Sequence, residues 1–356
     1  MKYKKLIITG GAGFVGSNLA IYFKKDNPKL KVITFDNLKR RGSELNLNRL
    51  REAGVEFIHG DIRNKEDLND IDKFDIMIEC SAEPSVLAGF NKSPDYAINT
   101  NLMGTINCLE AVRKNKSDIV FLSTSRVYPI KKISELKYVD TKTRFELGQK
   151  QTISGVSGNG ISEEFPLDGV RSLYGSTKLC SELLLQEYIE MYGIKGIINR
   201  CSIITGPWQM GKVDQGIVVY WIAKHIYNSQ LSYIGYGGNG KQVRDILHIR
   251  DLYDLLCIQL ADIEKYNGEI YNVGGGCSLS ISLCELTQLC QEVTKKSVKI
   301  NSIPKNRKGD IPYYITDYSK INKLTGWRPK KSLKSIFEEI AEWIDENKVM
   351  LKPILA

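Results

Sequence analysis

Histidine is scarce in this chain, and no spacing typical of metal ligands occurs. The 356 residues include three histidines, His59, His225 and His248, which lie far apart in the sequence. The eight cysteines contain no C-x-x-C pair, and most lie within apolar helix or strand patterns. Because zinc sites use cysteine and histidine ligands at short fixed spacings, we expect no metal site. We expect the thiols to be reduced, as they are in the cytoplasm.

Long apolar runs and basic tracts are also missing. No stretch approaches the ~20 apolar residues that a membrane-spanning helix needs, so we predict no membrane association. Residues 1–5 lead directly into a short apolar run that ends in glycines, without the cleavage site of a signal peptide, which predicts a cytoplasmic protein. The net charge of +9 comes from scattered lysines. This distribution argues against nucleic-acid binding and suits an anionic small molecule such as a diphosphate.

The clearest local pattern is a glycine turn between a strand and a helix. An apolar run at residues 4–9 is followed by Gly10, Gly13 and Gly16, and then by apolar residues at helical period. The first glycine permits a tight turn, the second lets a pyrophosphate approach the backbone, and the third lets the helix pack closely on the strand. The free N–H groups of the helix N-terminus would face the phosphates. The pattern predicts a dinucleotide site.

Asp36 ends a second apolar run, at residues 31–35, twenty residues after Gly16. A carboxylate at this position accepts hydrogen bonds from both hydroxyls of an adenosine ribose and repels a 2′-phosphate. Asp36 therefore favours NAD over NADP. The basic residues 39–41 follow closely and could bind a 2′-phosphate, so NADP stays an alternative.

Strand-like and helix-like segments then alternate along the first half of the chain. This alternation predicts an α/β fold, a Rossmann-type doubly wound parallel sheet that gathers ligands at the carboxyl ends of its strands. The predicted strands are 55–59, 75–78, 118–122 and 196–200, and the predicted helices include 94–114 and 179–192.

A chain of this length exceeds the ~250 to 300 residues that one core supports, so we expect two lobes. We predict an NAD-binding domain over residues 1–180, joined by strands at about 196–204 and 240–250. Residues 181–356 would form mainly a smaller, mixed α/β C-terminal substrate lobe. The segment 129–173 is long for a loop of a compact domain. It could be a functional lid, an oligomer contact or a flexible segment. We favour a lid or an oligomer contact.

Tyr174 and Lys178 lie four residues apart in a predicted helix and therefore share one face. An ammonium close to a phenol favours the phenolate, so this spacing can make tyrosine a usable base. By itself the spacing also occurs on ordinary solvated helix faces. Thr124 and Ser125 follow the strand at 118–122 and would bring hydroxyl groups to the same edge of the sheet.

Four features follow one another along the chain: the glycine turn, Asp36, the hydroxyl groups after the strand at 118–122, and the Tyr174–Lys178 pair. In this order they resemble the extended short-chain dehydrogenase/reductase family, the NAD-dependent nucleotide-sugar epimerases and dehydratases. Later segments with Arg307, Asp310 and Trp327 match as well. The resemblance implies bound NAD, a nucleotide diphosphate sugar as substrate, and a homo-oligomer, either a dimer or a tetramer. It also implies that Tyr174, Lys178 and Thr124 are catalytic, with Lys178 holding the nicotinamide ribose and Thr124 bonding the reacting oxygen.

The same resemblance implies two sets of contact residues. Those toward the cofactor are Gly10, Gly13, Phe14, Val15, Gly16, Asp36, Asn37, Asp61, Ile62, Ser81, Ala82, Asn101, Ser123, Tyr174, Lys178 and Arg200. Those toward the substrate are Thr124, Ser125, Arg126, Gln209, Gln215, Arg244 and Arg307.

The residues after Thr124 distinguish between branches of the family. The 4,6-dehydratases carry Asp and Glu there as acid and base, whereas this chain has Ser125 and Arg126. An arginine cannot give up its proton, which argues against dehydration. Segments at 35–38, 59–65 and 238–245 resemble epimerases that act on C2 of a CDP-sugar in the synthesis of bacterial surface polysaccharides. Alternatives are a 4-epimerase, a one-way ketoreductase or dehydrogenase, and a non-catalytic NAD-sensing regulator.

Several positions depart from the family pattern. Glu79 replaces the histidine that usually precedes the cofactor-lining alanines, and Pro129 replaces a glycine. Ile203 and Thr205 replace the Asn and Tyr that usually precede Gly-Pro. Because the last two positions lie near the sugar in this family, the sugar itself stays open.

Overall fold

The computed structural model describes residues 2–356, and these divide into two compact units. Each unit gathers three separate segments of the chain, and we describe each unit by itself. Unit 1 contains the residues up to Val127 together with Ser172–Arg200 and Tyr253–Tyr271. Unit 2 contains Tyr128–Arg171, Cys201–Leu252 and Asn272–Ala356.

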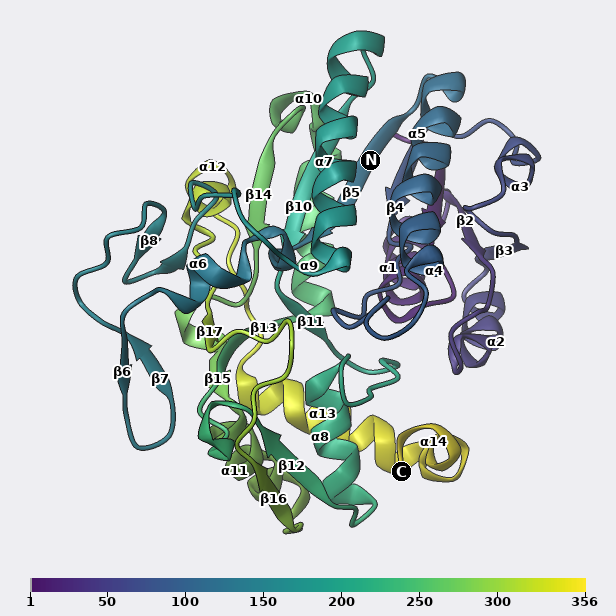
Figure 1. Cartoon of the computed structure of the whole chain (residues 1–356). Coiled ribbons are helices and arrows are strands. Elements are labelled where there is room, and N and C mark those ends of the chain that lie inside the picture. Colours follow the sequence, from purple (N-terminus) through teal and green to yellow (C-terminus); the bar gives the residue numbers. More distant parts are fainter. Residues whose placement is uncertain (1) are drawn as a thin grey trace. The chain divides into compact units, whose positions relative to one another are not determined.

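Unit 1 is organised by a seven-stranded sheet of order β14-β10-β5-β4-β1-β2-β3 (Figure 1). The pairs β1–β2, β2–β3, β1–β4 and β4–β5 are all parallel. The strand order reverses beside β1, which is the point where doubly wound sheets bind their ligands. The predicted Rossmann-type sheet is thereby confirmed. Its strands are β1 Lys5–Thr9, β2 Lys31–Asp36, β3 Glu56–His59, β4 Ile76–Glu79, β5 Asp118–Thr124, β10 Gly196–Cys201 and β14 Ile270–Val273.

The helices of unit 1 follow the predicted alternation. The predicted helix at 94–114 is interrupted by a π-helical turn, η2, at Asn99–Met103. Such turns are rare and often accompany functional sites. Helices α5 and α7 contact each other and run side by side (Figure 1). The helices are α1 Phe14–Asp26, α2 Asn46–Glu52, α3 Lys65–Asn69, α4 Asp95–Ile98, α5 Gly104–Asn115, α7 Leu173–Tyr192, α9 Ile249–Ala261, which continues from unit 2, and α10 Ile263–Tyr266.

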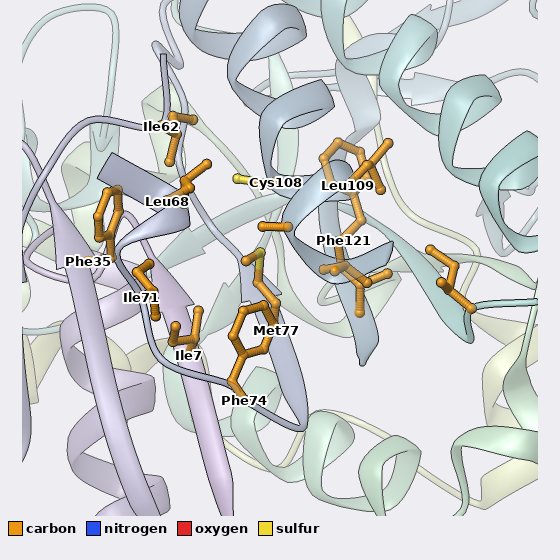
Figure 2. Close-up of a cluster of buried hydrophobic side chains, with 14 of the residues drawn as sticks. Ile7, Phe35, Ile62, Leu68, Ile71, Phe74, Met77, Cys108, Leu109 and Phe121 are labelled. Atoms are coloured by element: carbon orange, nitrogen blue, oxygen red, sulfur yellow. The ribbon is translucent and has the colours of Figure 1, made fainter. Parts of the chain in front are cut away.

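The core of unit 1 forms where central strands meet the helices that cover them. Ile7, Met77 and Phe121 come from neighbouring strands and are fully buried (Figure 2). Leu109 of α5 and Leu185 of α7 belong to the same cluster. Because a parallel sheet is covered on both faces, its strands read as continuous apolar runs rather than alternating ones. This burial fixes the strand ends that carry the site.

Unit 2 has a smaller sheet, in which β13 lies between β11 and β15 and also pairs with β17. The strands are β11 Ile203–Thr205, β13 Val243–His248, β15 Ser280–Ser282 and β17 Tyr313–Tyr314, beside a separate pair, β12 Leu231–Ile234 and β16 Ile300–Ile303. The helices are α6 Ile130–Ser134, α8 Ile217–Ile226, α11 Leu283–Thr294, α12 Ser319–Thr325, α13 Leu333–Glu346 and α14 Lys348–Leu355.

The division differs from the predicted boundary at residue 180. Residues 240–250 were expected in the large sheet, but β13 lies in the sheet of unit 2, because β14 occupies the place beside β10. Residues 196–201 do join the large sheet as β10, whereas 203–205 form β11 of unit 2. The two units are also similar in size, so the second is not a smaller lobe.

The segment 129–173 is ordered and belongs mostly to unit 2. It contains α6 and two hairpins, β6 Tyr138–Asp140 with β7 Phe145–Leu147 and β8 Val156–Ser157 with β9 Gly160–Ile161. The Phe145 N–H donates to the Lys241 carbonyl at 3.0 Å, and the Ile161 N–H donates to the Ile315 carbonyl at 2.8 Å. These bonds explain why the segment groups with unit 2 rather than with residues 1–127. Nowhere in residues 2–356 is there a helix long and apolar enough to cross a membrane.

Candidate active site

The glycine turn connects β1 to α1 as predicted. Gly10 has φ of 63°, and a Cβ on it would lie 2.9 Å from the Cys80 carbonyl carbon. A Cβ on Gly16 would lie 2.4 Å from the Gly10 oxygen, so both glycines are required by the fold. Gly13 caps α1 with ordinary backbone angles, and a Cβ on it would meet the Gly10 oxygen at 3.1 Å. The first turn of α1 holds no acidic side chain, so no negative side chain of that turn opposes an anion at its positive end.

Gly13→Ala is expected to weaken NAD binding about tenfold or more while changing the melting temperature little. The backbone at Gly13 accepts any residue, but the added methyl group would stand where the pyrophosphate approaches the helix N-terminus. The measurement is the NAD retained after gel filtration. Gly16→Ala is the contrast, because its Cβ meets backbone and should lower the melting temperature instead. Unchanged NAD retention in Gly13→Ala would contradict the assignment.

Asp36 lies at the end of β2, beside the glycine turn. Its Oδ2 accepts the Ala12 N–H at 3.1 Å, and its Oδ1 accepts the Leu38 N–H at 2.8 Å. Burial raises the pKa of the Asp36 carboxyl, and these two backbone bonds oppose that effect. The carboxylate is therefore held at the edge of the turn, where a ribose next to the pyrophosphate would lie.

Asn37 and Asp61 also lie together at the carboxyl ends of β2 and β3. The Asn37 side chain donates to Asp61 Oδ2 at 2.9 Å, and Arg63 forms a 2.6 Å ion pair with the same carboxylate. Burial acts to raise the pKa of Asp61, but the bonds from Arg63 and Asn37 lower it to about 2. The Ile62 side chain lies in the buried core cluster (Figure 2), so its backbone would make the predicted contact with adenine.

The three predicted catalytic residues all lie in unit 1. Tyr174 is half-buried in the first turn of α7, which Ser172 caps by accepting the Gly175 N–H at 3.2 Å. Lys178 follows one turn later and is 1% exposed. Thr124 ends β5, and α7 packs against both β5 and the turn that follows it. The fold thus brings the threonine, tyrosine and lysine to the same end of the sheet.

A buried carboxylate accompanies Lys178. Glu79, at the end of β4, has no exposed surface, and its Oε2 lies 3.4 Å from the Lys178 ammonium. Its Oε1 accepts the Ser81 N–H at 2.8 Å. The Lys178 Nζ also lies 3.9 Å from the centre of the Phe121 ring. Burial raises the pKa of Glu79, while the charge of Lys178 acts in the opposite direction.

Asn101 ties the loop after β4 to α7. It lies in the π-helical turn and is fully buried. Its Oδ1 accepts the Glu83 N–H at 2.7 Å, and its Nδ2 donates to Thr177 Oγ1 at 3.3 Å. The Ser181 hydroxyl donates to the Asn101 carbonyl at 3.0 Å. These bonds fix the loop that carries Ser81 and Ala82, which were predicted to pass near the nicotinamide ribose.

Arg200 is already paired within unit 1. Its Nη2 lies 2.7 Å from Oε2 of Glu182, and the side chains of both residues are at most 3% exposed. The Ser123 hydroxyl donates to the same carboxylate. The motifs in the sequence do not indicate Glu182 or a role for Glu79, although Tyr174, Lys178 and Glu182 stand at intervals of four residues on one helix face. Contact of Ser123 or Arg200 with the cofactor stays a prediction.

The predicted substrate residues divide between the units. Ser125 and Arg126 follow Thr124 in unit 1, and the Arg126 N–H donates to Thr124 Oγ1 at 3.2 Å. In unit 2, the Gln209 side chain bonds Thr205 and the Ile204 carbonyl. Gln215 is buried and forms a backbone bridge with Lys212.

The two predicted diphosphate ligands of unit 2 differ from each other. Arg244 forms a 2.9 Å ion pair with Asp310 and donates to the Ile311 carbonyl. Arg307 is partly buried, and its Nε has no hydrogen-bond partner. Arg307 is therefore the freer guanidinium, and both assignments stay predictions. Across residues 2–356, no group of three or more His, Cys, Asp and Glu side chains is arranged to hold a metal ion.

Comparisons with known proteins identify relatives of this chain. The family model described as "NAD dependent epimerase/dehydratase family" matches residues 6–274. The CDP-paratose 2-epimerase of Salmonella typhi is 34% identical over 348 residues, which cover 95% of this chain and 98% of that protein.

Two solved structures are similar along nearly the whole chain. A UDP-glucuronic acid 4-epimerase from Bacillus cereus, in complex with UDP-glucuronic acid and NAD, has a TM-score of 0.77 at 25% identity and covers 96% of this chain and 99% of its own. A dTDP-glucose 4,6-dehydratase from Bacillus anthracis, in complex with NAD, has a TM-score of 0.77 at 25% identity and covers 98% and 99%.

The glycine turn, the N-terminal end of α1 and the Asp36 carboxylate fit NAD. The family match and the two similar structures in complex with NAD confirm the predicted cofactor. The chain therefore belongs to the NAD-dependent epimerase/dehydratase family of nucleotide-sugar enzymes, within the extended short-chain dehydrogenases/reductases.

Proposed function

We propose that this protein is a cytoplasmic CDP-sugar 2-epimerase that acts on a sugar for bacterial surface polysaccharides. The observation that carries the proposal is the site of unit 1: Thr124, Tyr174 and Lys178 are present, while the two positions after Thr124 lack an acid and base pair. The similarity to a CDP-paratose 2-epimerase, also called CDP-tyvelose epimerase, supports the CDP-sugar and the carbon.

The reaction needs one proton and one hydride to leave the sugar and return. Tyr174, as phenolate, takes the proton of the C2 hydroxyl, and Thr124 donates a hydrogen bond to the same oxygen. NAD, held by the glycine turn and Asp36, would supply the hydride chemistry at C2. The flat 2-keto sugar presents its other face, and Tyr174 returns the proton to the oxygen. Nothing is consumed overall, and the pre-positioned groups provide much of the rate enhancement.

Elimination of water would need further groups that this site lacks. Proton transfer at the neighbouring carbon requires an acid and a base of matched pKa. Ser125 and Arg126 cannot supply that pair, because a guanidinium keeps its proton. This favours epimerisation over dehydration. In unit 2, Arg307 and Arg244 are the side chains that we propose for the diphosphate, since guanidinium groups bind phosphate oxygens in pairs.

We also propose a homo-oligomer. Exposed apolar side chains on neighbouring helices of unit 1 support it: Met103 follows α4, and Leu183 and Met191 lie on α7. Their exposed fractions are 45%, 56% and 67%, and a group of exposed apolar side chains on adjacent helices would suit a partner surface.

Incubation of the NAD-containing protein with CDP-paratose tests the function. We expect NMR to show a C2-epimerised CDP-sugar with no net change in NADH absorbance. Mass spectrometry of ligands that co-purify with the protein should find NAD and a cytidine nucleotide. Net use of external cofactor would indicate the dehydrogenase alternative, and a uridine or guanosine nucleotide would contradict the CDP assignment. Absence of turnover on any nucleotide sugar would favour the alternative function, a non-catalytic NAD-sensing regulator.

A further inference from the structure

The Lys178 ammonium is buried next to a carboxylate of the same unit. Its side chain is 2% exposed, and the Glu79 Oε2 atom lies 3.4 Å from it. Burial of an unpaired ammonium is strongly unfavourable, so a close counter-charge stabilises it. The lysine comes from α7 and the carboxylate from β4, and thus the pair joins a helix to a central strand.

Glu79 is itself held in place. Its second oxygen accepts the Ser81 N–H at 2.8 Å, and its strand is buried along its whole length. On the other side, the Phe121 ring from β5 lies 3.9 Å from the ammonium. The ammonium is therefore held between one carboxylate and one ring face, both on rigid strands.

We propose that Glu79 is a positioning residue that anchors the Lys178 ammonium and offsets its charge, so that this carboxylate sets the base strength of Tyr174. The inference rests on the proposed role of Tyr174 as the base, but not on the identity of the sugar. NAD, when bound, would add a second positive charge to this site. A carboxylate that offsets one of the two charges keeps the phenolate basic enough to take a proton near neutral pH.

Three other ionisable groups are considered around this pair: a neutral thiol, a carboxylate with its own counter-charge, and a carboxylate that accepts a backbone N–H. Cys108 of α5 is fully buried, and burial raises the pKa of its thiol, so it stays uncharged. Glu182 of α7 is paired with Arg200 of β10. Glu83, on the loop after β4, accepts the Ser85 N–H at 3.1 Å. Among these described groups, Glu79 is the one in ion-pair contact with Lys178.

A titration of Tyr174 itself tests the inference without any substrate. Tyrosinate absorbance near 295 nm is recorded against pH for the NAD-loaded protein, and the curve of Tyr174→Phe is subtracted to isolate Tyr174. The same difference is then measured with Glu79→Gln in both proteins. We expect the midpoint to fall by about 1 to 2 pH units, because the amide no longer offsets an ammonium roughly one helical turn from the phenol.

Glu79→His provides a second removal of the negative charge in case the glutamine variant does not fold. It places at this position the residue usual in the family, and it should lower the midpoint in the same direction. Glu110→Gln is the matched control, since it removes a carboxylate paired with Arg113 at 2.8 Å on α5. Glu110 accepts a bond from Tyr188, roughly 20 Å along α7 from Tyr174, and should leave the midpoint unchanged.

Three results would overturn the inference. An unmoved midpoint in Glu79→Gln or Glu79→His means that the carboxylate has no electrostatic effect on Tyr174. A rise in the midpoint means that Glu79 keeps Lys178 charged rather than offsetting it. A Tyr174 signal that does not titrate below pH 9 removes the proposed base, and therefore the proposed function as well.

Discussion

Tyr174→Phe is expected to lower kcat of the NAD-containing enzyme about 10²- to 10⁴-fold, the range attributed to a positioned general base. Phenylalanine fills the same space but cannot take the proton of a sugar hydroxyl. The fold should be retained, because Tyr174 is half-buried and the N-cap of α7 is supplied by Ser172 rather than by the phenol. Turnover is measured by NMR of the epimerised sugar, and folding by the thermal melt.

Tyr188→Phe is the matched control on the same helix. Its hydroxyl donates to Glu110 at 2.7 Å, far along α7 from the strand ends, so the variant should keep activity within about twofold. Near-normal turnover in Tyr174→Phe would refute the assignment of the base. A comparable loss of activity in Tyr188→Phe would mean that disturbance of the helix, and not loss of the Tyr174 hydroxyl, lowers the activity.

Much of unit 1 could be predicted because its signals are local. A buried parallel strand is a short apolar run, and a glycine turn before a helix is read directly from the sequence. Which strands become neighbours is a non-local property. Residues 240–250 were expected to join the large sheet, yet β14 takes the place beside β10 and β13 organises the sheet of unit 2. Likewise, no propensity distinguishes the π-helical turn at Asn99–Met103 from the helix around it.

The site could be predicted where its residues are recognised by their separation along the chain. Gly10, Asp36 and the tyrosine and lysine of α7 are identified by their separation along the chain. Motif spacing does not reveal whether a charged side chain is free for a ligand or paired inside the protein. Arg200 and Arg244 were predicted to contact the ligands, and each forms an ion pair within the protein. The partners of such pairs are distant in sequence and become visible only in the fold.

Arg200→Met should destabilise the protein by about 3–5 kcal/mol, the second large effect that the structure predicts. The substitution leaves the Glu182 carboxylate buried with its main counter-charge removed, since the side chains of this pair are 3% and 1% exposed. The Ser123 hydroxyl still donates to Glu182, but one neutral hydrogen bond does not replace a guanidinium. Thermal unfolding followed by circular dichroism measures the loss.

Two further variants distinguish the stability cost of leaving a buried charge unpaired from the cost of losing an arginine. Arg113→Met removes a pair of similar length, 2.8 Å, whose side chains are 37% and 25% exposed, and should change the melting temperature little, because solvent screens an exposed pair. The double variant Arg200→Met with Glu182→Met removes both buried charges and should recover most of the stability, because an apolar pair needs no compensation. NAD retention in the double variant then decides the role of Arg200. Retention close to that of the unaltered protein assigns the guanidinium to the fold, whereas loss of NAD from a stable double variant assigns it to the cofactor.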